Sequence, residues 1–598
     1  MSLYIFSPFV SLVTSVILFF GCFETGKILF TKFKIHQSIE SVSIPEFQYT
    51  TIGIVIISIL IFPLVAFTGY AEIVLRSIAF ILLFLGIRFL FTSKYIFLKI
   101  NFKNSDLYFY IYILVLTLYF FIALSPLTAA DVLDYHTGMA INILRLNQYL
   151  LLPEWFTGLQ SGHGEPLIAL GLSVKAEQFG SLVQFSSLLS ISGIIIKFSR
   201  DKLIYASKYF IILTILSCPI LIFLLSGNKP QIFYSSLLFL SFSLNFTKNE
   251  NIKTNIISYL IINILICICV MGKFSFNLTG ALIWIYSTIN FVKKTNVKIL
   301  LIPVLVFFML FLPFIYWKFI NLGGSIYGYF FSPFPLHLPG YETFLSHNKG
   351  SQEIPFPNFL FYTSLSRITE FLAMNPIFFV ILLFYFKEKK EIQIILILSS
   401  IFIIISNTYA SPSARYYLDI ILWLTFAIIL LNNVKLIKYL KILFFPQILI
   451  VLIILLYSNY NFLPGSFTVA NYQKVKNRYA YLYSGFEWLN ENIPDESKIL
   501  IINRPISLYK SFAVSGGFNY FTNKDESIYY KKLIKDYKLD YIAYLGNDEN
   551  LMHLKNCTNG IYKKKKNIGY HATRNPFNRG GNYNGYIYYI DNNKLPNC

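Results

Sequence analysis

The sequence predicts a polytopic α-helical membrane protein with about 14 transmembrane helices, followed by a C-terminal α/β domain outside the cytoplasm. Its composition excludes a soluble protein of this size, because 56% of the 598 residues are hydrophobic and only 13% are charged. Apolar stretches of the length that a helix needs to cross the hydrocarbon recur as far as about residue 460. They centre near residues 13, 60, 82, 117, 189, 217, 238, 263, 284, 308, 377, 400, 425 and 451.

Basic residues set the expected orientation, because Lys and Arg in short loops stay on the cytoplasmic side. Basic clusters fall in every second loop, at 27–34, 94–103, 197–202, 248–253, 293–298, 387–390 and 435–441. This alternation supports the span count and places the N-terminus on the outer side. The long loops 128–180 and 319–366 and the tail from about residue 460 are then also outside.

This topology divides the chain into three parts. They are an N-terminal extension of about three spans (1–106), a core (107–460) with outer loops 128–180 and 319–366, and an outer domain (461–598).

The outer domain has helical patterns at 479–492 and 526–538 and strand-like runs at 498–503, 540–545 and 586–590, which predict a small α/β fold. The basic run 563–566 is expected in a solvated loop, with anionic lipid headgroups or an acidic glycan as the alternative partner. Cys557 and Cys598 both lie in this tail, where an oxidising compartment would allow a disulfide.

The first residues with chemical potential follow the apolar stretch near residue 117. Asp131, Asp134 and His136 lie where the chain is expected to leave the bilayer on the outer side. One reading is structural: Asp131 caps a helix that continues to about Leu150, and both acids favour the positive end of its dipole. The other reading is a carboxylate base at the interface, with partial burial raising its pKa. The two readings are compatible.

The same outer loop continues to Gly162-His163-Gly164-Glu165-Pro166. Flexible glycines around His163 and Glu165 either bring these side chains to a site, for example against an acceptor, or form the turn back into the membrane.

Three isolated cations lie at the outer ends of spans. They are Lys229 in a short Asn-Lys-Pro break, Lys273 in a Gly-Lys-Phe-Ser turn, and Arg415 before Tyr416 at the start of a late span. A buried cation at this depth is costly unless it reaches water or meets an anion. Three of them on one side favour a shared anionic ligand, and a lipid phosphate is the anion found at that depth.

Together these motifs resemble the GT-C superfamily of integral membrane glycosyltransferases, over roughly residues 107–460. The likeness is to the bacterial branch of protein-mannosyltransferase and aminoarabinose-transferase-like proteins. It rests on Asp-x-x-x-Tyr-His from Asp131, on the Lys229 and Lys273 turns, and on Ala-Arg-Tyr-Tyr-Leu around Arg415. The sequence departs from the family at Val132, where many relatives carry Glu after the Asp.

The resemblance implies a GT-C-like fold and an inverting transfer from a polyprenyl-phosphate sugar donor to a glycan, lipid or protein acceptor. It implies Asp131 as base or metal ligand, with Asp134 as second choice, and Arg415 with Tyr416 as the contact to the donor phosphate. Lys229 or Lys273 would assist. A divalent metal at Asp131 is the one cofactor to consider. The expected location is the bacterial inner membrane, among membrane lipids, with the site facing the periplasm.

Two other classes compete with this interpretation. A surface-polysaccharide polymerase or ligase would use arginines in the outer loops as catalytic groups, but the 319–366 loop contains no arginine. A lipid-linked glycan transporter or flippase would show paired repeats and ionisable residues near the midplane, and no convincing repeat is seen. A nucleic-acid partner is not expected, because the net charge of +21 is mostly explained by cytoplasmic loops and the tail.

Overall fold

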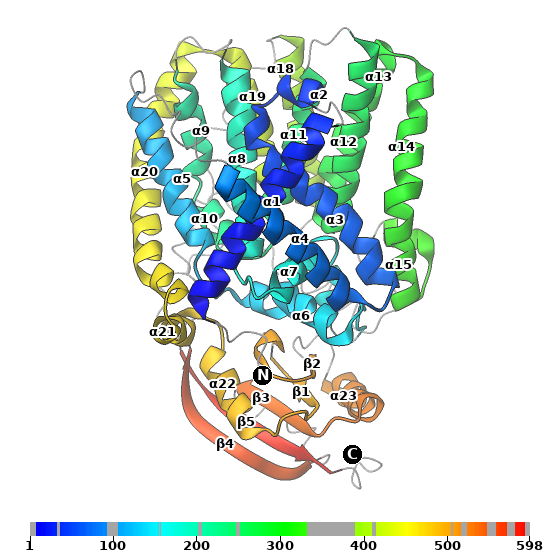
Figure 1. Cartoon of the computed structure of the whole chain (residues 1–598), viewed down its shortest axis with the longest axis vertical. Coiled ribbons are helices and arrows are strands. Elements are labelled where there is room, and N and C mark those ends of the chain that lie inside the picture. The colour runs from blue at the N-terminus through cyan, green and yellow to red at the C-terminus, as the bar shows by residue number, and fades with distance from the viewer. Residues whose placement is uncertain are drawn as a thin grey trace.

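A bundle of helices stands on a smaller domain of helices and strands in this computed structural model (Figure 1). The structure describes residues 7–32, 36–92, 106–153, 155, 157–200, 206–246, 251–330, 332, 389–409, 414–503, 506–515, 523–546, 558–570 and 581–591.

The N-terminal helices are α1 (Pro8–Lys32), α2 (His36–Glu40), α3 (Tyr49–Phe67) and α4 (Ala71–Thr92). The core begins with α5 (Leu107–Ala123), α6 (Thr137–Leu146), α7 (Gly164–Ser173), α8 (Phe179–Ser199), α9 (Lys208–Leu216), α10 (Ile220–Leu225) and α11 (Gln231–Ser243). It continues with α12 (Ile252–Gly272), α13 (Asn277–Lys294), α14 (Leu301–Val306), α15 (Leu312–Leu322), α18 (Lys390–Tyr409), α19 (Leu418–Leu431) and α20 (Val434–Phe462).

The predicted apolar stretches fall on these helices, or on short breaks between them near residues 217 and 308; the stretch near residue 377 lies outside the described residues. The count of about 14 spans is not confirmed, because seven helices in the described part are long and apolar enough to cross a membrane. Others are shorter, such as α5 with 17 residues and α11 with 13. Pro219 begins a new short helix after α9 and so divides that stretch in two. The seven long apolar helices indicate an integral membrane protein.

The N-terminal extension packs directly on the core. Ser11 of α1 donates a hydrogen bond to Gln178 Oε1 at 2.8 Å, just before α8. Gln48, before α3, exchanges hydrogen bonds with Ser190 of α8 through its amide nitrogen (3.0 Å) and oxygen (2.8 Å). The extension therefore forms one wall of the helical bundle.

The C-terminal part contains α21 (Val469–Tyr479), α22 (Tyr483–Asn492) and α23 (Asn523–Tyr537), with β1 (Ile499–Ile501), β2 (Ala513–Ser515), β3 (Tyr541–Gly546), β4 (Thr558–Tyr570) and β5 (Gly581–Ile590). The strands form one mixed sheet in the order β2-β1-β3-β5-β4. β1 runs parallel to β2 and β3, and β5 runs antiparallel to β3 and β4. A C-terminal α/β fold was predicted, and the strands expected near 498, 540 and 586 are present.

Two details of that prediction are wrong. The helix expected at 479–492 begins only at Tyr483, as α22, because Leu482 has a left-handed φ of 57° and separates α22 from the preceding α21. The basic run Lys563–Lys566 is not a loop but part of β4, which lies at one edge of the sheet. Lysines on an edge strand discourage pairing with another chain. The predicted Cys557–Cys598 disulfide lies outside the described residues.

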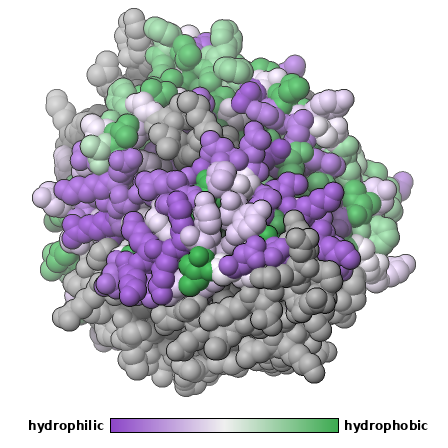
Figure 2. All heavy atoms as spheres, turned by 90° about the horizontal axis from the view of Figure 1, so that it is seen from below, coloured by the Kyte–Doolittle hydropathy of each residue, from purple (hydrophilic) through white to green (hydrophobic). Residues whose placement is uncertain are grey.

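The face of the molecule that carries this sheet is largely hydrophilic where it is described (Figure 2). The four lysines of β4 are exposed. The helical bundle instead exposes large apolar side chains such as Phe84 and Phe91 on α4. The contrast fits a bundle surrounded by lipid and a domain surrounded by water.

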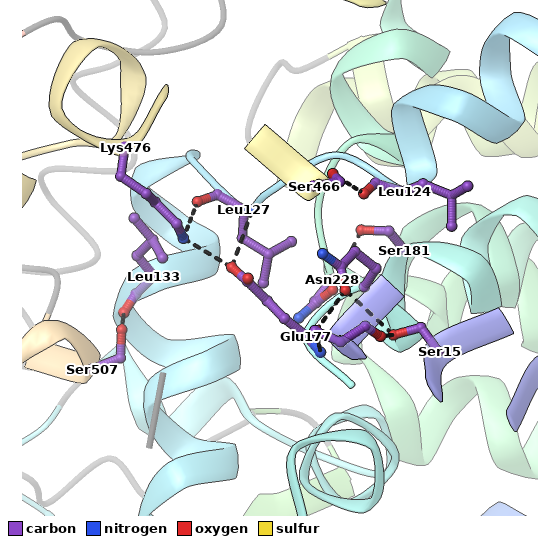
Figure 3. Close-up of polar contacts among 12 residues, drawn as sticks. Ser15, Leu124, Leu127, Leu133, Glu177, Ser181, Asn228, Ser466, Lys476 and Ser507 are labelled. Atoms are coloured by element: carbon purple, nitrogen blue, oxygen red, sulfur yellow. Dashed lines mark hydrogen bonds and ion pairs between the residues drawn. The ribbon is translucent and has the colours of Figure 1, made fainter. Parts of the chain in front are cut away.

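A buried ion pair joins the C-terminal part to the core. Lys476 of α21 lies 2.8 Å from Glu177, which precedes α8, and the two side chains are 0% and 9% exposed. Lys476 also donates to the Leu127 carbonyl oxygen at 2.7 Å, and Glu177 accepts from the Leu127 amide at 3.3 Å (Figure 3). The amide and the carbonyl group of Leu127 are therefore both held by hydrogen bonds, and Leu127 lies a few residues before Asp131.

Breaking this pair should destabilise the protein strongly. Lys476→Met leaves the Glu177 carboxylate buried without its cation, which costs about 3–5 kcal/mol in comparable pairs. We expect a clearly lower Tm in detergent. Lys474→Met is the matched control, because Lys474 lies on the same helix and is exposed. Equal Tm values for the two variants would contradict the assignment.

Candidate functional site

The helices α6 and α7, which carry or directly follow several of the predicted site residues, lie at the end of the bundle that faces the C-terminal domain (Figure 1). Asp131 precedes a single π-helical turn, Val132–His136, which leads into α6. Its backbone is already helical and its side chain makes no capping hydrogen bond, so the capping prediction for Asp131 is wrong. The helix also ends earlier than predicted, at Leu146, because Asn147 has a left-handed φ of 55°.

The Asp131 carboxylate meets two cations that are far apart in the sequence. Its Oδ2 lies 2.9 Å from Lys229 Nζ and 3.9 Å from Arg415 Nη1. Lys229 comes from the break between α10 and α11, and Arg415 from the short turn Ala414–Tyr417 before α19. A Cβ at Gly227 would lie 2.6 Å from Val132 Cγ2, so the absence of a side chain there lets this break approach the Asp131 turn closely.

Lys273 joins the same group through Gln231 and Tyr416. It caps α12, donates a hydrogen bond to Gln231 Oε1, and lies 5.7 Å from the centre of the Tyr416 ring. Arg415 donates to the Tyr416 hydroxyl at 3.1 Å, and Gln231 donates to the Arg415 carbonyl oxygen at 3.4 Å. We call Asp131, Lys229, Lys273, Arg415 and Tyr416 the cation cluster.

The cation cluster has more positive than negative charge in a water-poor setting. Burial, and then the charge of Arg415, lower the pKa of Lys229, while Asp131 opposes the shift. Burial and the neighbouring Lys229 and Arg415 lower the pKa of Lys273 well below its usual range. Mutual repulsion of this kind is relieved by an anion, so the arrangement is suited to bind one.

Two buried hydrogen-bond donors in this region have no partner among the described residues. They are Nε of Arg415 and Nδ2 of Asn228, the neighbour of Lys229. A buried donor without a partner costs about 1–3 kcal/mol. A ligand that accepts hydrogen bonds would remove this cost, which favours an anion with several oxygens.

Asp134 is not part of the cation cluster, and it contacts residues of the outer loop. Its side chain is 1% exposed and accepts hydrogen bonds from Trp155 Nε1 at 3.3 Å and from Thr157 Oγ1 at 3.2 Å. It therefore holds the outer loop against α6 and is poorly placed to accept a proton from a substrate.

His136 and Glu165, which the sequence left open as site residues, contact each other. His136 Nδ1 lies 2.8 Å from Glu165 Oε1, and the other carboxylate oxygen accepts from the Gly162 amide at 2.7 Å. Burial lowers the pKa of His136, although Glu165 opposes the shift. The pair ties the start of α6 to the start of α7 behind the cation cluster.

His163 is a buried packing residue. Its ring stacks on Phe62 of α3 with centroids 4.0 Å apart, and its Nδ1 lies 3.3 Å from Ser58 Oγ. Of the two readings of the Gly162–Pro166 segment, the turn into the membrane fits these contacts better.

Sequence reasoning missed Gln231, Asn228 and the Lys476–Glu177 pair. Asn228 and Gln231 lie on either side of Lys229, at the short break before α11. Their closeness to Lys229 in the sequence was the feature that could have indicated them. Lys476 and Glu177 lie 299 residues apart, and no local pattern connects them.

A divalent metal does not fit Asp131 in this setting. Among the residues that the structure describes, no group of three or more His, Cys, Asp or Glu side chains is placed to hold one. The Asp131 carboxylate instead faces the ammonium of Lys229 and the guanidinium of Arg415, which repel a divalent cation. No step is therefore assigned to the metal that the resemblance allows.

The family model described as the DUF1420 N-terminal domain matches residues 87–476. The chain belongs to the DUF1420 family. Its DUF1420 domain extends from within α4 to Lys476 and contains every residue of the cation cluster. No curated protein matches the chain in sequence.

Solved structures similar to this DUF1420 chain include two of ArnT from Cupriavidus metallidurans. The structure bound to undecaprenyl phosphate has a TM-score of 0.49 and 9% identity, and the match covers 81% of this chain and 97% of that one. The apo structure has a TM-score of 0.46 and 10% identity, with the same coverage.

His163 should remain neutral at physiological pH. Burial lowers its pKa to about 3, far below the usual value near 6.5. The folded protein then loses stability as the pH falls below about 6.5, because only the unfolded chain takes up this proton readily. NMR of histidine-labelled protein, with His163→Gln for assignment, should show no titration of this ring between pH 5 and 8. A midpoint near 6.5 would refute it.

Proposed function

We propose that this protein is an inverting glycosyltransferase that moves a sugar from a polyprenyl-phosphate donor to an acceptor hydroxyl. The observation that carries the proposal is the cation cluster, in which one carboxylate and three cations from four separate segments meet at one end of an apolar bundle. A carboxylate beside a strong anion site supplies the two groups that such a transfer needs.

The anion is proposed to be the phosphate of the lipid donor. Arg415 offers an Nε that has no hydrogen-bond partner among the described residues, and Lys229 and Lys273 offer ammonium groups in the same cluster. Donors fixed in place before the reaction stabilise negative charge as it develops, and they do so best where water is excluded. They would stabilise the phosphate as the glycosidic bond to it breaks.

Asp131 is proposed as the base. Phosphate entering between Lys229 and Arg415 would take over donors that now face Asp131, which frees its carboxylate to accept a proton. The acceptor hydroxyl loses that proton to Asp131, and its oxygen bonds to the anomeric carbon. The bond from that carbon to the phosphate oxygen breaks, and its electron pair leaves with the lipid phosphate. Attack opposite the leaving group inverts the anomeric carbon.

The isoprenoid chain needs an apolar surface that is open to lipid. A groove of about 460 Å³ between α3 and α15 is lined by Phe67, Leu312, Pro313 and Tyr316 with other apolar residues. It is open to the surface that faces lipid and is a suitable place for part of the chain.

We further propose that the site faces the periplasm of a bacterial inner membrane. The basic clusters of the short loops support this orientation, and the hydrophilic face around the C-terminal domain fits an aqueous compartment (Figure 2).

Asp131→Asn should reduce sugar transfer by roughly 10²–10⁴-fold, because a positioned general base contributes about this much. The assay is transfer from a polyprenyl-phosphate sugar in purified membranes, with the surface glycan of a deletion strain used to identify the sugar. Asp495→Asn, on the exposed surface of the C-terminal domain, is the control and should leave the rate unchanged. Full activity of Asp131→Asn would falsify the assignment.

Arg415→Met should weaken binding of undecaprenyl phosphate by at least about ten-fold, since a hydrogen bond to a charged group contributes about 1.5–3 kcal/mol. Binding to protein in nanodiscs is measured by the change in intrinsic fluorescence. Arg478→Met, an exposed arginine on α21, should bind as wild type. If Arg415→Met binds equally well, the cation cluster is not the phosphate site.

A further inference from the structure

A second pocket with polar groups adjoins the cation cluster at Lys273. It lies between the turn that joins α12 to α13, the segment around Ser161, and α15. Its lining includes Lys273, Lys318, Ser161, Gln160 and Asn277, among apolar residues such as Phe314. We call it the two-lysine pocket. Lys273 lines this pocket and also belongs to the cation cluster, so the two sites share one residue.

The second lysine is deeply buried in the helical bundle. Lys318 of α15 is 3% exposed, and its Nζ donates to the Leu159 carbonyl oxygen at 2.6 Å. A bundle that only needed a helix tether at this place could use a neutral donor, because burying a cation costs several kcal/mol.

The polar groups of the pocket have a definite pattern. Two lysines from different elements line it, Lys318 on α15 and Lys273 after α12, and Gln160 and Ser161 add neutral polar groups. Oδ1 of Asn277 is buried and has no hydrogen-bond partner among the described residues. Ammonium groups select an anion, whereas an unpartnered amide oxygen selects a hydroxyl or another donor. A ligand that satisfies both carries an acid and a hydroxyl group close together.

The size of the pocket narrows the choice further. Its volume of about 30 Å³ is small. It has room for about two water molecules, since a water needs at least about 10–15 Å³ by this measure. A carboxylate, with two oxygens, fits this space better than a phosphate with its larger tetrahedral shape or a whole sugar ring.

We propose that the two-lysine pocket binds the carboxylate of an acidic sugar, with Lys318 and Lys273 as its cations and Asn277 as acceptor for an adjacent hydroxyl. The proposal rests on the proposed function, because the carboxylate belongs either to the sugar of the lipid donor or to the acceptor glycan. In both cases the pocket is a specificity site: it selects acidic over neutral sugars, and Lys273 serves both this pocket and the phosphate site.

The test uses the full chain in nanodiscs saturated with undecaprenyl phosphate, so that the phosphate site is filled. D-Glucuronate and D-glucose are then titrated separately, and binding is followed by saturation-transfer NMR. We expect glucuronate to bind and glucose not to bind. Equal binding of the two sugars, or binding of inorganic phosphate in competition with glucuronate, would overturn the proposal.

Two variants connect this binding to the pocket. Lys318→Met removes one cation, and Asn277→Asp introduces a like charge with almost no change of shape. Each should weaken glucuronate binding at least about ten-fold. Lys298→Met, an exposed lysine before α14, should have no effect. If Lys318→Met does not fold, Asn277→Asp decides: unchanged glucuronate affinity in Asn277→Asp sinks the proposal.

A last comparison assigns the source of the carboxylate and separates the two proposals. Undecaprenyl-phosphate-linked glucuronic acid replaces undecaprenyl phosphate in the nanodisc. If the donor sugar fills the pocket, free glucuronate no longer binds; if the acceptor does, it binds as before. Failure of the phosphate site appears differently, as undecaprenyl phosphate that does not bind at all or binds equally to Arg415→Met.

Discussion

The organisation of the outer end of the bundle depends on how buried positive charge is balanced. Asp131 is the acid in direct contact with Lys229 and Arg415, and Lys273 adds a further cation nearby. Each of these groups would be unfavourable alone in an apolar bundle. Together they leave an excess of positive charge and unused donors. Without a ligand, the cluster therefore keeps some repulsion between its cations and some unsatisfied donors. A bound anion would remove both costs.

The position of Asp131 is fixed from both sides. On one side the Glu177–Lys476 pair holds the backbone of Leu127, and on the other the Asp134 carboxylate and the His136–Glu165 contact hold the turn into α6. These contacts come from three outer segments and from the tail. A catalytic group must be held within about half an ångström to work well. Under the proposed function, the acids near Asp131 therefore position it and do not replace it as the base.

Prediction from the sequence was most successful where a residue type has a single physical meaning, as a long apolar stretch or an isolated cation at the end of a span does. Apolar stretches gave the helices, and isolated cations at span ends gave Lys229, Lys273 and Arg415 as a set. It was less successful for the acids, because Asp131 and Asp134 have the same local signals. Only the contacts with Trp155 and Thr157 separate their roles. The predicted count of about 14 spans is not confirmed in the described part of the chain, since apolar length alone does not reveal breaks such as that at Pro219. The two-lysine pocket joins segments about 160 residues apart, and no local pattern shows it.

Beside the Lys476–Glu177 ion pair, three further contacts that join the tail to the core have one property in common. Arg145 of α6 donates to the carbonyl oxygens of Tyr509 and Ser511, Ser507 donates to that of Leu133, and the Tyr481 amide donates to that of Thr128. In each contact at least one partner is the main chain, which every residue type supplies. The residues that supply only a carbonyl oxygen can therefore change their side chains without loss of these hydrogen bonds between the tail and the core. The tail is free to diverge between relatives, and to adapt to different surroundings, while the core keeps its alignment.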